Sequence, residues 1–268
     1  MNLGVLFKFQ QNRRRGKFST MTNNLKDLDW RIWNKNHLIE ERSYKRAIGE
    51  LPEMESAKQL RNIIGEIDDC ETILDVGCAV GHYLRSIRLL NPVCHYVGVD
   101  ATHQYIDSAV ELHAGDQNAR FYHGDVFDLN HKADIVFCCN LLLHLPELRC
   151  PLENLLASFN DRLIVRTLMS QRTHLSQYLY DDKFDASGNP KNFQFQNTYS
   201  FDYVKSIVNG FDKDIKISFL EDEFIAENIQ NEGNDWRKKQ GFATTSVSGS
   251  LQIAGDKVFR WAWMICTK

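Results

Sequence analysis

A short run of residues that reads as a strand, a tight turn and the start of a helix constrains this chain more than any other feature. Residues 73–81 spell Ile-Leu-Asp-Val-Gly-Cys-Ala-Val-Gly, so an apolar strand leads into a turn of small residues. Such a turn lets a ligand lie directly against the backbone, because Gly77, Ala79 and Gly81 have little or no side chain. A second apolar strand ends at Asp100, 19 residues after Gly81. This spacing predicts a carboxylate where a doubly wound fold holds the hydroxyl groups of a ribose.

The pattern around this turn predicts one α/β domain. Between residues 72 and 165, short β-branched runs alternate with amphipathic helical stretches, which is typical of a parallel sheet covered by helices on both faces. Residues 28–67 read as helices, and we expect them to form a cap on the domain. Residues 167–200 interrupt the alternation and read as an insertion after the fifth strand. The alternation then resumes, passes through a polar stretch, and ends in a strand at residues 258–266.

Composition and charge narrow the class of protein. The 268 residues are 43% hydrophobic and 25% charged with a formal net charge of −3, which is ordinary for a soluble globular chain. The whole chain therefore lacks the basic excess of a dedicated nucleic-acid binder. The local exception is residues 1–27, which we expect to be a flexible basic leader before a single domain at residues 28–268.

Cysteine and histidine spacing bear on metal binding and location. The seven cysteines include no Cys-x-x-Cys pair, and the nine histidines lack the spacing of a zinc site, so we expect no local metal centre. Free cysteines in apolar segments favour a reducing compartment, and we expect a cytoplasmic protein. No stretch approaches the roughly 20 apolar residues of a membrane span.

Four motifs, in this order, resemble the class I S-adenosylmethionine-dependent methyltransferases. They are Asp-Val-Gly-Cys-Ala-Val-Gly at residues 75–81, Gly-Val-Asp at 98–100, His-Gly-Asp-Val at 123–126, and Asp-Ile-Val-Phe-Cys-Cys-Asn at 134–140, which leads to His-Leu-Pro at 144–146. The one departure is Ala79, where the family most often has glycine. The resemblance implies a Rossmann-like, doubly wound sheet of seven strands with an antiparallel last strand, and S-adenosyl-L-methionine as the cofactor.

The resemblance also implies a role for each matched residue. The turn residues would bracket the methionine part and the ribose, with Asp75 near the methionine amino group. Asp100 would take the ribose hydroxyls, Asp125 the adenine amino group, and Asn140 would line the methionine side. The expected cofactor-binding residues are Asp75, Gly77, Cys78, Ala79, Gly81, Asp100, Ala101, Asp125, Val126 and Asn140. The alternative interpretation of Asp125 is a turn carboxylate bonded to its own backbone, and that of Asp100 is a strand-end cap.

Residues for the acceptor and for proton transfer are expected on the same edge of the sheet. His144 is our expected general base, because its loop faces the reacting centre in this fold; a structural histidine is the alternative. Arg166, Asn197 and Tyr199 are expected to bind the acceptor, since the insertion and its approach lie where doubly wound folds bind ligands. These side chains favour a small polar acceptor such as a sugar, methylated on oxygen, although packing onto the core is the alternative for the aromatic ones.

Other functions stay open at the level of sequence. The basic leader would suit an RNA acceptor, and a protein acceptor is compatible with the same domain. A nicotinamide-dinucleotide oxidoreductase shares the glycine turn and the acid, and a non-catalytic binding relic shares the fold. The chain has no Asn-Pro-Pro-Tyr sequence after the fourth strand, which argues against amino-methyltransferases of adenine, cytosine and glutamine. Oligomeric state is not indicated.

Overall fold

The computed structural model describes residue 33 and residues 37–68, 71–179, 183–186, 188, 192–222, 246–248, 251–254 and 257–268. The expected basic leader at residues 1–27 lies outside this part of the chain. None of the helices in the described ranges is long and apolar enough to cross a membrane.

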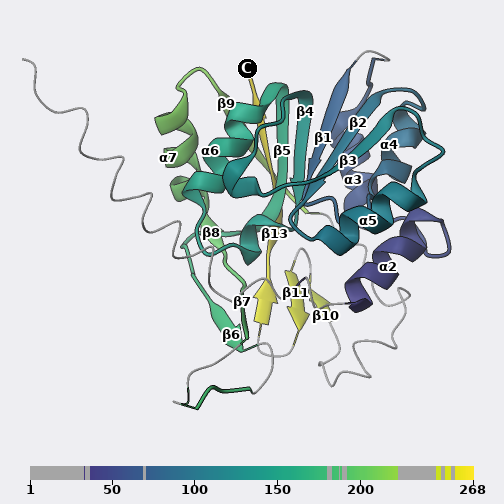
Figure 1. The fold of residues 1–268 in the computed structure, drawn as a ribbon. Helices are drawn as coiled ribbons and strands as arrows, with labels where there is room; N and C mark the ends of the chain where they lie inside the picture. Colours follow the sequence, from purple (N-terminus) through teal and green to yellow (C-terminus); the bar gives the residue numbers. More distant parts are fainter. Residues whose placement is uncertain are drawn as a thin grey trace, which may run out of the picture.

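A central sheet organises the domain (Figure 1). Its hydrogen-bonded order is β3-β2-β1-β4-β5-β13-β9, and the short β8 pairs with β5 off this path. The strands are β1 Thr72–Val76, β2 His95–Asp100, β3 Ala119–His123, β4 Ala133–Cys139, β5 Phe159–Ser170, β8 Tyr199–Ser200, β9 Lys216–Glu221 and β13 Trp261–Thr267. Neighbours from β3 to β5 pair in parallel, whereas β13 is antiparallel to both β5 and β9. The expected doubly wound sheet with an antiparallel last strand is therefore confirmed.

Helices cover both faces of this sheet, because successive strand residues point to opposite sides. The helices are α2 His37–Ala47, α3 Glu55–Ile64, α4 Leu84–Leu90, α5 His103–Leu112, α6 Arg149–Ser158 and α7 Phe201–Phe211. On one face, α6 and α7 pack against Leu74 and Val136 in the larger apolar cluster. On the other face, α3 and α4 pack against their strand neighbours Ile73 and Ile135. Figure 1 shows α6 and α7 gathered on the opposite side of the sheet from α3 and α4.

Three boundaries differ from those expected from the sequence. Strand β5 continues to Ser170 instead of ending near Val165, because β13 pairs with it as far as Leu168. The last strand is divided at Arg260 into β12 Lys257–Phe259 and β13. The polar stretch before it contains β10 Ser246–Ser248 and β11 Leu251–Ala254, which form a small sheet with β12. Alternation alone did not reveal these short strands, since they pair only with one another.

The expected insertion contains a hairpin that lies beside the carboxyl ends of the main strands. Strand β6 Gln177–Leu179 pairs antiparallel with β7 Phe193–Phe195, and a bridge joins His174 to Thr198. Figure 1 shows this hairpin and α2 at the same end of the sheet, with β1, β2 and β4 ending between them. The insertion and the N-terminal cap therefore border the edge where a ligand site is expected.

Candidate functional site

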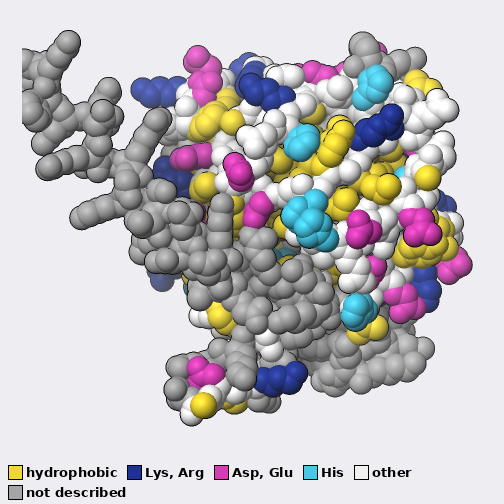
Figure 2. All heavy atoms as spheres, in the orientation of Figure 1, with side chains coloured by type: hydrophobic (Ala, Val, Ile, Leu, Met, Phe, Trp, Pro, Cys, Tyr) yellow, Lys and Arg dark blue, Asp and Glu magenta, His cyan; other side chains and the backbone are white. Residues whose placement is uncertain are grey.

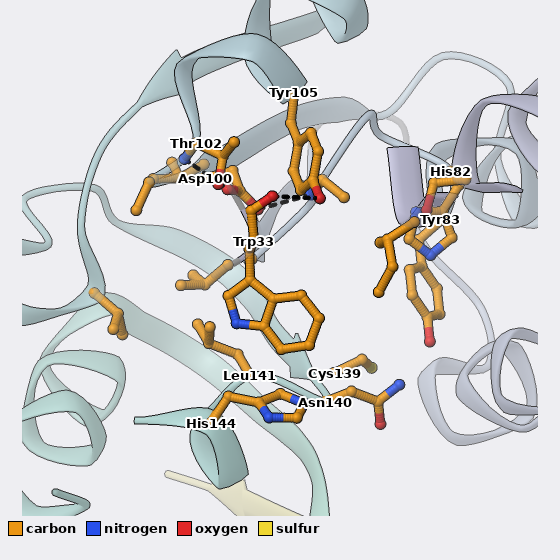
Figure 3. A pocket seen from close by; sticks show the side chains of 18 of the residues that line it. Trp33, His82, Tyr83, Asp100, Thr102, Tyr105, Cys139, Asn140, Leu141 and His144 are labelled. Atoms are coloured by element: carbon orange, nitrogen blue, oxygen red, sulfur yellow. Dashed lines mark hydrogen bonds between the residues drawn. The ribbon is translucent and has the colours of Figure 1, made fainter. Parts of the chain in front are cut away.

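A cavity of about 270 Å³ opens at the carboxyl ends of β1, β2 and β4. Its floor comes from the glycine turn, the end of β2, and residues 124–126, 139–141, 144 and 145. Its cover comes from the cap through Trp33, Ile39 and Arg46. Figure 3 shows Trp33 between Asp100 and Tyr105 on one side and Leu141 and His144 on the other. The sequence motifs thus converge on one cavity, although not every residue in them reaches it.

The glycine turn adopts a backbone that favours residues without a side chain. Gly77 has φ +83° and Gly81 has φ +74°, and Ala79 between them has φ +48°. A Cβ atom on Gly81 would lie 2.6 Å from the Phe121 ring, so glycine is needed there for packing. Gly77 and Ala79 line the cavity, whereas Gly81 does not. The turn therefore places Gly77 and Ala79 where a ligand can lie against them, and Gly81 allows Phe121 of β3 to pack closely on the turn.

Asp100 forms the strand-end cap that the sequence left open, and it also lines the cavity, where its ribose role stays a prediction. Its Oδ2 accepts from the Ala79 amide at 2.9 Å, and its Oδ1 accepts from the Thr102 amide at 2.8 Å. Burial raises the pKa of this carboxyl, and the two backbone amides offset part of that effect. Each carboxylate oxygen has a second lone-pair site, and Asp100 lines the cavity. A strand-end cap can therefore also accept from ribose hydroxyls, so these residues fit an adenosine-containing cofactor.

Two motif residues point away from the cavity. Asp75 is 1% exposed, and its Oδ2 accepts from the Tyr96 hydroxyl at 2.5 Å. Burial raises the pKa of Asp75 to about 8. Cys78 is completely buried, and neither residue lines the cavity. The expected contact between Asp75 and the methionine amino group is therefore not prepared in this structure, because the pleat of β1 turns the side chain into the core.

Asp75→Asn should leave cofactor affinity unchanged and alter how stability depends on pH. The pKa is about 8 in the folded chain and 3.8 as a model value, so the aspartate's contribution is full below the lower value and is lost as pH rises through the higher one. Asparagine does not titrate. Chemical denaturation should show the variant gaining about 2.5–3 kcal/mol relative to the parent between roughly pH 5 and pH 7. Every other charged group is present in both proteins and cancels in the difference. A difference that stays constant with pH would contradict the buried, protonated carboxyl.

The third motif lies along the cavity wall. Asp125 caps the short helix Val126–Asp128 by accepting from the Phe127 amide at 3.0 Å, and it also lines the cavity. Val126 and Ala101 line the cavity as well. His123, at the start of this motif, does not line the cavity and stacks on His103 at 3.4 Å. The turn interpretation of Asp125 is thus observed, and its adenine role stays a prediction.

Asn140 lines the cavity, and its side chain is held by the buried ion pair of Arg166 and Asp222. Its backbone has φ +62°, and its Oδ1 accepts from Arg166 Nη1. Arg166 is 5% exposed, donates to Asp222 Oδ2 from Nε at 2.6 Å, and lies over the Trp261 ring at 4.1 Å. Arg166 does not line the cavity. The expected acceptor-binding arginine is therefore engaged by Asp222, 56 residues away, and contacts a cavity-lining residue, Asn140, from behind.

His144 stands on the floor of the cavity at the end of the helix Leu142–His144. Its Nδ1 lies 3.0 Å from the Phe195 carbonyl oxygen, and its ring meets Trp33 edge-on at 4.5 Å. A carbonyl oxygen can only accept, so Nδ1 carries the proton and Nε2 keeps its lone pair. Burial lowers the pKa of His144 to about 4, which keeps the ring neutral at physiological pH.

Asn197 and Tyr199 lie under the His144 loop instead of in the cavity. Both are 0% exposed, and neither lines the cavity. The Tyr199 hydroxyl donates to the Leu142 carbonyl at 2.9 Å, and Asn197 Nδ2 donates to the Leu145 carbonyl at 2.8 Å. Direct acceptor binding by these two side chains is therefore not prepared, because the extended segment that carries them packs its alternate residues inward.

Several cavity residues were not among the expected binding residues. Tyr105, in the first turn of α5, lines the cavity and donates its hydroxyl to the Trp33 carbonyl at 3.0 Å. Tyr83 also lines it, and its hydroxyl lies 3.1 Å from Ser56 in α3. Both residues lie where a helix begins after a strand, and this position in the sequence could have identified them as cavity residues. They join the cap to the core beside the cavity.

Comparison with known proteins agrees with this geometry. Residues 67–183 match a family model described as a methyltransferase domain. Among curated proteins, none matches the chain. Among solved structures, a protein from Bacillus subtilis is 14% identical with TM-score 0.48, covering 80% of this chain and 99% of its own.

Two further solved structures are similarly distant. A SAM-dependent methyltransferase from Aquifex aeolicus is 14% identical with TM-score 0.45, covering 79% of this chain and 88% of its own. Coclaurine N-methyltransferase, bound to N-methylheliamine and SAH, is 12% identical with TM-score 0.49, covering 80% of this chain and 72% of its own. At these values the likenesses say nothing about the acceptor. Residues 67–183 are thus a methyltransferase domain, and the sheet with its antiparallel β13 and the cavity at the glycine turn agree with the class I type of that domain, whose cofactor is S-adenosyl-L-methionine.

Proposed function

We propose that this enzyme methylates an oxygen atom of a small polar acceptor, with His144 as the general base. The observation that carries the proposal is the neutral imidazole at the cavity floor, whose Nδ1 is committed to the Phe195 carbonyl. S-adenosylmethionine supplies an activated methyl group when bound. The protein's own task is then to hold the acceptor in line and to remove the hydroxyl proton as the oxygen is methylated.

The protonation state of His144 suits this task. Since Nδ1 donates to Phe195, the lone pair on Nε2 is the position that can take a proton. The low pKa, about 4, means that the base form is fully present at neutral pH. It also makes the imidazole a weaker proton acceptor than an exposed one, so positioning supplies more of the rate than basicity does.

The surroundings of the cavity favour a small acceptor over a macromolecule. Apolar side chains enclose the cavity from both sides, Trp33 and Ile39 from the cap and Leu141 from the floor, and polar groups such as Tyr105 and Asn140 also stand in its wall. Figure 2 shows acidic and basic side chains interspersed over the described part of one molecular face, unlike the basic stripe that follows a nucleic-acid backbone. RNA and protein acceptors are the competing readings.

Asp100→Ala should weaken the binding of S-adenosylhomocysteine, because the ribose hydroxyls would lose their charged acceptor. We expect a loss of about 1–3 kcal/mol, or roughly five- to 150-fold in affinity, measured by calorimetry. Asp212→Ala is a matched control, since this exposed aspartate also accepts from a nearby backbone amide but lies outside the cavity. Equal affinities for the parent and Asp100→Ala would remove Asp100 from the cofactor site.

The acceptor class can be tested without knowing the acceptor. The purified enzyme is incubated with methyl-labelled cofactor and an extract of the source cell that has been separated into small-molecule, protein and RNA pools. We expect label in the small-molecule pool, with an alkali-stable methyl ether in the product. Label confined to RNA or to protein would overturn the small-acceptor proposal while leaving the methyltransferase assignment intact.

A further inference from the structure

The loop that carries His144 is held from beneath by one short segment of the insertion, residues 195–199. Three successive groups of this segment donate to carbonyls of the loop. Leu143 accepts from the Asn197 amide at 2.8 Å, Leu145 from Asn197 Nδ2 at 2.8 Å, and Leu142 from the Tyr199 hydroxyl at 2.9 Å. The segment accepts in return from His144 through the Phe195 carbonyl. The insertion therefore supplies both the carbonyl that accepts from His144 and the groups that hold the loop around it.

This contact is buried, and the side-chain oxygen and nitrogen of Asn197 both have hydrogen-bond partners. Asn197 Oδ1 accepts from the Ser176 amide at 3.0 Å, and its Nδ2 also lies 3.2 Å from the Tyr199 hydroxyl. Asn197 and Tyr199 are each 0% exposed. A buried side-chain amide that lost these partners could not replace them with water, so breaking the arrangement costs free energy and one geometry is favoured.

We propose that residues 195–199 select the tautomer and the direction of His144, which makes Asn197 and Tyr199 positioning residues for proton transfer. The proposal rests on the base role of His144 proposed above. The Phe195 carbonyl requires a proton on Nδ1, so it leaves Nε2 as the proton acceptor. Asn197 and Tyr199 hold the loop at the distance that lets this bond form.

If the His144 ring were released from this segment, it would lose its fixed tautomer and its burial. Without the Phe195 bond, a neutral imidazole takes either tautomer, and only part of the population keeps its lone pair on Nε2. A loosened loop would also admit water to the ring, and the pKa of His144 would rise from about 4 towards its ordinary 6.5. Both changes can be observed apart from any loss of activity.

The test replaces one hydroxyl. Tyr199→Phe removes the bond to Leu142 and keeps the ring that packs in the core. We expect turnover to fall by about 10- to 100-fold at unchanged cofactor affinity, the effect of a small misplacement of a catalytic group. The acid limb of the pH–rate profile should move upward from about 4. Tyr122→Phe, on the exposed outer strand β3, is the control and should change neither.

A second readout keeps this proposal separate from the base role itself. With histidine labelled by nitrogen-15, the parent should show His144 protonated on Nδ1, and Tyr199→Phe should show mixed tautomers. Asn197→Ala, which removes the Leu145 bond, should show the same mixture if it folds. A folded Tyr199→Phe with the parent's tautomer and turnover would overturn the inference. If His144→Ala proved fully active, the base role would fail, but the tautomer measurement would still report whether the segment fixes the ring.

Discussion

Replacement of Arg166 by methionine should lower the free energy of unfolding by about 3–5 kcal/mol, measured by denaturant titration. The change leaves the Asp222 carboxylate, which is 1% exposed, without its partner inside the protein. It also removes the guanidinium from above the Trp261 ring. Breaking one side of a buried ion pair is more harmful than removing the pair, because an uncompensated charge stays in a region of low dielectric.

Two comparisons isolate this ionic effect. The double variant Arg166→Met with Asp222→Leu should recover most of the loss, since no charge is then left unpaired. Arg149→Met, which removes an exposed pair with Glu153, should change stability by about 0–1 kcal/mol. A loss below about 1 kcal/mol in Arg166→Met would mean that water reaches Asp222 and that the pair is effectively on the surface.

The parts of the site that the sequence predicts are those set by chain order. Asp100 is at the end of a strand that directly follows the glycine turn and its helix, so the strand's end alone brings it to the cavity. The same holds for Asn140 at the end of β4 and for His144 in the loop after it. The sheet order follows from the alternation of strands and helices, and the antiparallel β13 follows from the family resemblance.

Roles that depend on distant partners are not visible in the sequence. Arg166 pairs with Asp222, 56 residues away, and Tyr199 bonds Leu142, 57 residues away. Asp75 is turned towards Tyr96 by the pleat of β1, and a shift of one position would have pointed it at the opposite face. A motif gives a residue's place on an element, but only the packed neighbours decide whether the side chain meets ligand or core.

His144→Ala should reduce turnover by about 10²–10⁴-fold, the usual share of a general base, while the affinity for S-adenosylhomocysteine stays within about twofold. The binding contacts to the glycine turn and Asp100 are made elsewhere on the cavity wall, which is why affinity should survive. His95→Ala is the control, because this exposed histidine at the start of β2 lies outside the cavity and should leave turnover unchanged.

The pH dependence of the parent enzyme separates a base from a purely structural histidine. Protonation of His144 occurs with a pKa of about 4, below its ordinary 6.5, because the ring is buried. Turnover should therefore be level from neutral pH down to about pH 5 and fall as pH approaches 4, where Nε2 becomes occupied. Stability falls over a wider range, since the unfolded chain takes up the proton below 6.5 and the folded one only near 4. Rates are therefore compared only where circular dichroism shows the folded state. An acid limb centred near 6.5 in folded protein would show that the ring is exposed and that Phe195 does not hold it.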